Sequence, residues 1–290
     1  MKKLAESDLQ SGDILIFENQ DFNLIKLLDE LRQDFDEADL AKKTHAAFYL
    51  LLYLIPWFDP GCEGNNYRNI YHAAIWADVD LNRGKGDPNL ASKIVQAGRK
   101  GIVTADIPST LKEDTVKNVY VYRSRFADNV FQEKVNAATQ QFLNDSSIPY
   151  AYETAWMLAV ICSLRYSDGQ LHKILVEKLG KEGADLMVIF IRQLINKYAK
   201  THQKHMVACS TLVAMIYENA GYALHVDALK QNPDIEMPAD FQLKTDLFSF
   251  YKRPKTNELP KIDVTETVIT PRQLAESPDV TLVGYLAGVK

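Results

Sequence analysis

Short β-rich segments in the N-terminal half constrain the fold of this chain more than any other feature. They are rich in β-branched and aromatic residues, are bounded by Gly, Pro, Asn or polar residues, and cover residues 13–17, 69–80, 93–97 and 118–123. The third segment turns through Gly98 to Gly101 into a further apolar pair, Ile102 and Val103. Segments of this length and spacing predict an antiparallel sheet or a small barrel.

Helical patterns dominate the remainder of the chain. Apolar residues recur at helical spacing in 22–42, in 130–143 and in the region 152–203, where one helix is expected to end at Gly180. A helix is expected to end at Gly221, and another to begin after Thr270, which is a good N-cap before Pro271. Strands followed by helices predict an α+β fold.

Cys209 lies where small residues lead into the amphipathic helix that ends at Gly221. In the first turn of a helix, unpaired N–H groups and the positive end of the helix dipole favour thiolate over thiol. A thiolate can attack a carbonyl carbon, so Cys209 is a candidate nucleophile. The alternative is a small buried residue, since free cysteines are often buried.

His72 lies in the alternating segment 69–80. Its odd positions from Ala73 to Val79 are apolar and are expected to face the core. His72, Ala74 and Trp76 are then expected on the opposite face, toward a cleft or solvent. A histidine that merely fills the core is expected on the apolar face instead.

Composition limits the functional classes. The chain has 290 residues, of which 47% are hydrophobic and 24% charged, as expected for a soluble globular protein with a sizeable core. The net charge is −5, and no cluster of Lys and Arg interleaved with aromatic residues occurs, so we expect no nucleic-acid partner.

Cysteine usage and the N-terminus bear on location. Cys62, Cys162 and Cys209 cannot all pair within one chain and form no CxxC motif, which favours a reducing compartment. The basic start of the chain lacks a following apolar stretch, so no secretory signal is expected. We expect a cytoplasmic protein, with export by a route without such a signal left open.

Residues 44–58 form a nearly continuous apolar run that ends before Pro60. The run is shorter than the ~20 residues of a membrane span, so no transmembrane segment is expected. We expect a buried helix, with an element that touches a membrane surface or covers an acyl chain as the alternative.

Several short motifs occur in an order that resembles a known family. They are Gly12-Asp13-Ile14-Leu15, Tyr71-His72-Ala73-Ala74-Ile75, Ile94-Val95-Gln96-Ala97, Val119-Tyr120-Val121-Tyr122-Arg123, Pro149-Tyr150, Cys209-Ser210-Thr211-Leu212-Val213 and Thr270-Pro271-Arg272-Gln273-Leu274. The chain thereby resembles the circularly permuted branch of the NlpC-type papain-like cysteine hydrolases, the YiiX-like proteins, whose fold is similar to that of the lecithin:retinol acyltransferase group. The cysteine follows the histidine here, as in the permuted branch.

The resemblance implies a single permuted papain-like domain over residues 1–290. A small antiparallel sheet or barrel packs on the helix of the nucleophile, and helical insertions occupy about 22–66 and 152–203, outside the match. The implied nucleophile is Cys209 and the implied base is His72. Gln96 is the implied orienting residue, although a neutral amide stabilises imidazolium less than a carboxylate does. Tyr150 is a candidate oxyanion donor beside the backbone N–H of Cys209.

No metal or organic cofactor is implied. His202, His205 and Cys209 have helical spacing and are a competing metal-site hypothesis, but a partner motif is missing. His45 imitates the motif of His72 but is followed by the apolar run, so it is not expected to be catalytic.

The expected function is a thiol hydrolase that cleaves an amide or ester through an acyl-enzyme intermediate. The partner is then a small peptide-like or lipid-like substrate. The alternatives are a lipid acyltransferase, a non-catalytic module that binds a lipid or amino acid, and an interaction scaffold built on the helical insertions. Asp13 and Asp78 are expected to cap turns or to be solvated rather than to bind substrate.

Overall fold

The computed structural model describes residues 1–20, 54–56, 69–79, 93–98, 101–113, 115–144, 168–201, 209–226 and 269–288. Its centre is a sheet of six strands in the order β4-β3-β2-β1-β5-β6. The strands are β1 (Ile14–Asn19), β2 (Ile70–Trp76), β3 (Ile94–Gly98), β4 (Gly101–Ala105), β5 (Val116–Ser124) and β6 (Val280–Ala287). All neighbouring strands are antiparallel, which confirms the α+β class and the antiparallel sheet.

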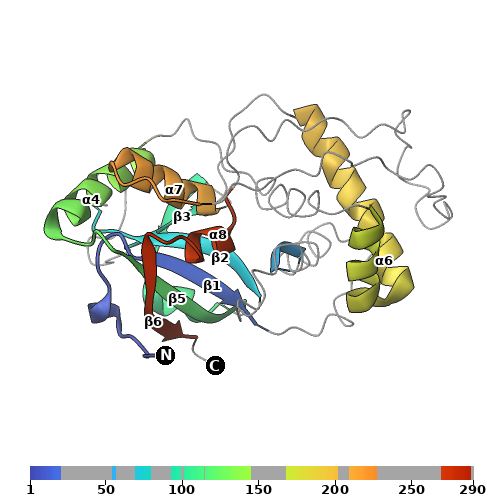
Figure 1. Ribbon diagram of the computed structural model, residues 1–290, viewed down its shortest axis with the longest axis horizontal. Coiled ribbons are helices and arrows are strands. Elements are labelled where there is room, and N and C mark those ends of the chain that lie inside the picture. Colours follow the sequence, from blue (N-terminus) through green and yellow to red (C-terminus); the bar gives the residue numbers. More distant parts are fainter. Residues whose placement is uncertain are drawn as a thin grey trace.

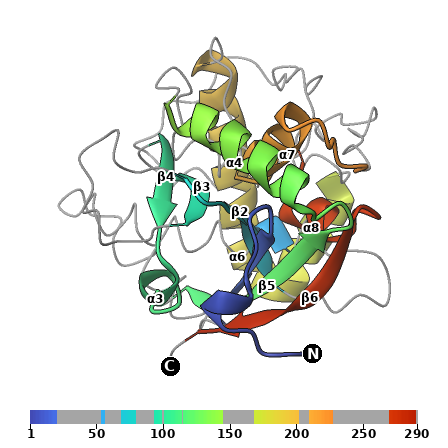
Figure 2. The ribbon, with the colours of Figure 1, turned by 90° about the vertical axis from the view of Figure 1, so that its left-hand side faces the viewer.

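Helices pack on this sheet, and the longest described helix stands beside it (Figures 1 and 2). They are the 3₁₀ helix η1 (Glu6–Asp8) and the α-helices α3 (Ile107–Thr110), α4 (Asn129–Asn144), α6 (Asp168–Thr201), α7 (Cys209–Asn219) and α8 (Pro271–Ala275). Helices α4, α7 and α8 cover one face, where their apolar residues form a buried cluster with β1, β2 and β3. Ile107 of α3 and Leu4 belong to a second buried cluster on the other face.

The alternation of apolar residues explains this two-sided burial. Ile14, Ile16 and Ile75 pack beneath α7, whereas Leu15 and Trp76 pack in the second cluster. The prediction that the face of Ala74 and Trp76 opens toward a cleft or solvent is therefore wrong. Because both faces of the sheet are covered, both sets of side chains are removed from water.

Helix boundaries follow the predicted signals closely. Gly221 has a φ of 85° at the end of α7, and Gly180 has a φ of 69° where α6 is kinked. Thr270 caps α8 by accepting a hydrogen bond from the backbone of Gln273. The sequence did not predict β6, nor the single turn of α3 that Asp106 caps.

The regions expected to be insertions are described only in part. Of the apolar run 44–58, residues 54–56 are helical, and Leu54 and Ile55 are buried, as expected for a core helix. Helix α6 stands beside the layer of sheet and helices in Figure 1. Among the described helices, none is long and apolar enough to cross a membrane.

Two buried contacts fix α7 and β5 to the start of β1. Tyr217 of α7 donates a hydrogen bond to the carbonyl oxygen of Gly12 over 2.5 Å, and its ring packs against Phe131 of α4. Arg123 of β5 makes two hydrogen bonds to the carboxylate of Asp13, which is 1% exposed. Asp13 also accepts the backbone N–H of Gln10, so it caps a turn as predicted.

Candidate active site

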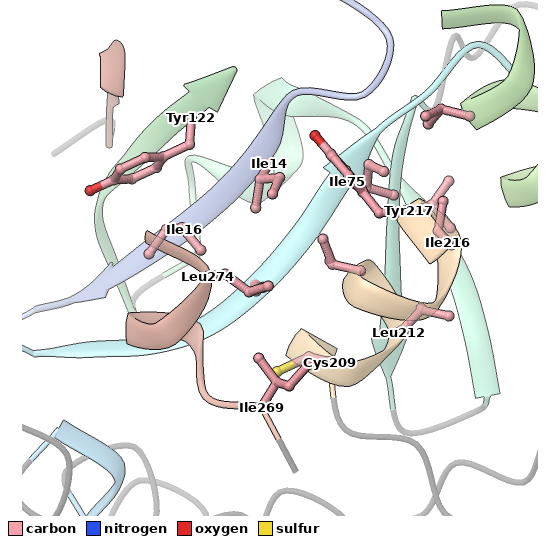
Figure 3. Packing of buried hydrophobic residues seen from close by; sticks show 14 of the residues in the cluster. Ile14, Ile16, Ile75, Tyr122, Cys209, Leu212, Ile216, Tyr217, Ile269 and Leu274 are labelled. Carbon is pink, nitrogen blue, oxygen red and sulfur yellow. The ribbon is translucent and has the colours of Figure 1, made fainter. Parts of the chain in front are cut away.

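Cys209 is the first residue of α7 and is buried, with 5% of its surface exposed. Leu212, Val213 and Ile216 of the same helix are fully buried against the sheet, which fixes the helix on β2 and β3. The hydroxyl of Ser210 donates to the carbonyl oxygen of Ile269, so the first turn is also held from the side. Figure 3 shows Ile269 beside Cys209 at the start of α7. The thiol therefore occupies a rigid position at a helix N-terminus.

His72 lies at an irregularity of β2. Phe17 pairs with His72 and Glu18 with Ile70, so Tyr71 is an extra residue on β2 at this point. Bulges of this kind are common beside active sites, because they change the direction of a side chain. The rings of Phe17 and Tyr71 flank the half-buried imidazole, with centroids 5.0 and 6.1 Å away. They restrict its orientation.

Gln96 of β3 holds the imidazole from the neighbouring strand. The ladder between β2 and β3 consists of only two pairs, Ile75 with Val95 and Trp76 with Ile94. Beyond these pairs, Nε2 of His72 and Oε1 of Gln96 lie 2.7 Å apart. An amide oxygen can only accept, so Nε2 carries a proton, and Nδ1 remains to face the thiol of Cys209.

The thiol and the imidazole shift each other's pKa in opposite directions. Burial by itself raises the pKa of Cys209, but the charge of His72 and a hydrogen bond from it bring that pKa below the usual value. Burial by itself lowers the pKa of His72, but Cys209 and Gln96 raise it above the usual value. The arrangement favours a thiolate beside an imidazolium.

Backbone N–H groups also stabilise negative charge at the sulfur atom. Hydrogen bonds with the backbone of Ala73 and of Ser210 lower the pKa of Cys209 further. They come from β2 and from the first turn of α7, the two elements that meet at the thiol. A thiolate at this position can act as a nucleophile without a metal ion to activate it.

The structure brings together three of the predicted site residues, Cys209, His72 and Gln96. Tyr150, the predicted oxyanion donor, lies outside the described residues, as do His45, His202 and His205. Within the described ranges, no group of three His, Cys, Asp or Glu side chains could hold a metal ion. Asp78 is paired with Lys93 and is 68% exposed.

One charged residue that affects His72 was not predicted. The charge of Glu113, in the turn between α3 and β5, raises the pKa of His72, after the larger effects of Cys209 and Gln96. Glu113 lies far from His72 in the sequence and belongs to no motif.

Comparison with protein families, curated proteins and solved structures found no match for the chain. The geometry of Cys209, His72 and Gln96 is therefore the basis for any functional assignment.

Proposed function

We propose that this protein is a cysteine hydrolase that cleaves an amide or ester bond through an acyl-enzyme intermediate. The observation that carries the proposal is the contact of a thiol with an imidazole whose second nitrogen is held by an amide. Nucleophile, base and orienting group are the parts that thiol catalysis requires, and they come here from α7, β2 and β3.

The first half of the reaction forms a thioester. The thiolate of Cys209 attacks the carbonyl carbon, and the carbonyl oxygen takes up the negative charge. When this intermediate collapses, the bond between carbon and the leaving nitrogen or oxygen breaks. The imidazolium of His72 gives its Nδ1 proton to the leaving group, so an amine or alcohol departs.

The second half regenerates the enzyme. Neutral His72 accepts a proton from water as the water oxygen attacks the thioester carbon. The bond between carbon and sulfur then breaks, the carboxylic acid departs, and the thiolate and imidazolium are restored. During both halves Gln96 accepts the Nε2 proton and holds one tautomer of the ring.

Negative charge on the substrate oxygen needs hydrogen-bond donors. The N-terminus of α7 favours negative charge, and the backbone N–H of Cys209 is the donor that we assign there. Tyr150 is the proposed second donor, on the resemblance alone. The fold that we propose is the permuted papain-like one, with the histidine strand before the helix of the nucleophile and with the sheet packed on that helix.

Acyl trapping tests this function. The protein is incubated with p-nitrophenyl esters of short and long acyl chains and with peptide thioesters, and the adduct is located by mass spectrometry. We expect an acyl group on Cys209 that is lost with time in water, and no such adduct in Cys209→Ala. In His72→Ala, acylation should fall by at least about 100-fold. Acylation that is independent of both residues would contradict the proposal.

A further inference from the structure

Ile269 lies against the first turn of α7. Its carbonyl oxygen accepts the hydroxyl of Ser210, the residue after the nucleophile, and Ser210 is fully buried. The side chain of Ile269 belongs to the same buried cluster as Cys209, and Figure 3 shows the two side chains next to each other. Backbone and side chain thus both place Ile269 at the thiol.

The segment that carries Ile269 is also fixed on the side of α8. Thr270, the next residue, accepts the N–H of Gln273 over 3.2 Å, and its own N–H donates to Oε1 of Gln273 over 2.8 Å. Thr270 and Gln273 are buried, and Leu274 of α8 is fully buried in the cluster with Ile269. This reciprocal cap and the hydrogen bond from Ser210 hold Ile269 from both sides.

The other contacts of the thiol come from different elements. His72 and the backbone of Ala73 belong to β2, and the backbone of Ser210 belongs to α7. Ile269 is the apolar side chain that the segment before α8 adds to this set. Cys209 and Ile269 are each only 5% exposed, so little free space surrounds the sulfur atom.

When the thiolate attacks, the carbonyl carbon carries three groups besides sulfur. The oxygen takes up negative charge at the N-terminus of α7, and the leaving group takes its proton from His72. The remainder of the acyl group is left with the side of the thiol that neither donor occupies. We propose that Ile269 forms the wall on that side and determines specificity, by admitting acyl groups that are unbranched at the carbon next to the carbonyl. This inference rests on the proposed function.

The chemistry of isoleucine gives the direction of this selection. A side chain branched at Cβ is stiff, and Ile269 is packed in the core, so it cannot move aside for a second substituent without disturbing its neighbours. It has no polar atom that could compensate a charged group for lost hydration. Glycyl and straight-chain acyl groups should therefore fit, whereas acyl groups from other amino acids should not.

Two isomeric esters test this inference. p-Nitrophenyl butyrate and p-nitrophenyl isobutyrate contain the same atoms, but only the isobutyrate is branched beside the carbonyl. With enzyme in excess, release of p-nitrophenolate gives the acylation rate of Cys209, after subtraction of the rate of Cys209→Ala. We expect wild type to prefer the butyrate about tenfold more strongly than the free thiol N-acetylcysteine does, since a pocket that excludes one methyl group discriminates by this order.

Three variants locate the source of the preference. Ile269→Ala should remove most of it, and Ile269→Val, a mild change that keeps the test if alanine prevents folding, should lower it by a smaller factor. Ile216→Val makes the same change at a fully buried residue about two turns further along α7 and should keep the wild-type ratio. An unchanged ratio in both Ile269 variants, or equal decreases in Ile269→Val and Ile216→Val, would overturn the inference.

The outcome also distinguishes this inference from the function on which it rests. If Cys209 is acylated but discriminates between the esters no more than the free thiol does, the role of Ile269 is wrong and the hydrolase stands. If p-nitrophenolate is released equally fast by wild type and by Cys209→Ala, both proposals fail. A preference that falls in the Ile269 variants alone supports both.

Discussion

At the scale of single residues, the contacts of Cys209 decide whether it is reactive or inert. A cysteine that is 5% exposed has a raised pKa if nothing compensates for burial. Here His72 and two backbone N–H groups reverse that effect. Reactivity is therefore a property of α7 and β2 together, since neither element alone provides both the thiol and its partner.

Gln96 is predicted to fix the tautomer of His72. In Gln96→Ala the imidazole loses its acceptor at Nε2, so the Nδ1–H tautomer becomes populated and can no longer take the thiol proton. We expect acylation of Cys209 to slow by about 10- to 100-fold. Long-range ¹H–¹⁵N NMR of His72, recorded at a pH at which the imidazole is neutral, should show the second tautomer.

The conservative variant provides the control for this prediction. Gln96→Glu keeps an acceptor and adds a negative charge, so it should retain the tautomer and raise the pKa of His72. If Gln96→Ala retained a single Nε2–H tautomer and the wild-type rate, Gln96 would have no orienting role.

The residues of the site differ in how far the sequence could reveal them. Cys209 is visible as the start of an amphipathic helix, and His72 as a polar residue in an apolar strand. Gln96 was predicted only through the resemblance. The extra residue at Tyr71 was not predicted, because it depends on how β2 pairs with β1.

At the scale of elements, the position of α7 depends on Gly12, which precedes β1 and contacts the C-terminal part of α7 rather than the thiol at its start. Gly12 has a φ of 94°, and a Cβ atom there would overlap the ring of Phe131. Its carbonyl oxygen accepts the hydroxyl of Tyr217 of α7. Gly12 thus allows α4 and α7 to pack together against the start of β1.

Replacement of Gly12 by alanine is predicted to destabilise the protein strongly. The variant combines a left-handed backbone, which costs about 1 kcal/mol, with overpacking against Phe131, which costs about 1–3 kcal/mol. The free energy of unfolding in urea should fall by about 2–4 kcal/mol.

Gly221 provides a matched control. It has a similar φ of 85°, but a Cβ atom at this position would have no neighbour within 4 Å, so Gly221→Ala should cost only about 1 kcal/mol. Equal losses in Gly12→Ala and Gly221→Ala would show that the contact with Phe131 is unimportant.

At the scale of the whole molecule, local patterns and long-range contacts were predictable to different degrees. Four strands, the hairpin of β3 and β4, the C-terminal end of α7 and the start of α8 follow from periodicity, glycine and capping residues. The strand order does not, because β1 lies between β2 and β5, which are distant in the sequence. Strand β6 was missed, although it completes the sheet beside β5.

Asp279 joins three distant segments and is predicted to make stability depend on pH. It accepts hydrogen bonds from the backbone and the ring of His225, and it pairs with Arg125. Burial by itself raises its pKa, but these partners lower it below the usual value. The folded protein therefore gains stability above the unfolded pKa of about 3.9 and loses it as pH falls toward the folded value.

Asp279→Asn should remove this contribution. We expect the variant to lose about 1–2 kcal/mol at pH 7 and to lose less than wild type on acidification to pH 3. Urea unfolding at both pH values measures the difference. Parallel losses in the two proteins would show that Asp279 does not couple folding to pH.

The most direct test of the central claim is the pH profile of Cys209 alkylation in wild type and in His72→Ala, with Cys62 and Cys162 replaced by serine. We predict a wild-type profile whose acidic limb lies well below about pH 8.5, and a limb in His72→Ala that moves up toward or beyond that value. A wild-type thiol that reacts only near or above pH 8.5, unchanged by loss of His72, would contradict the account.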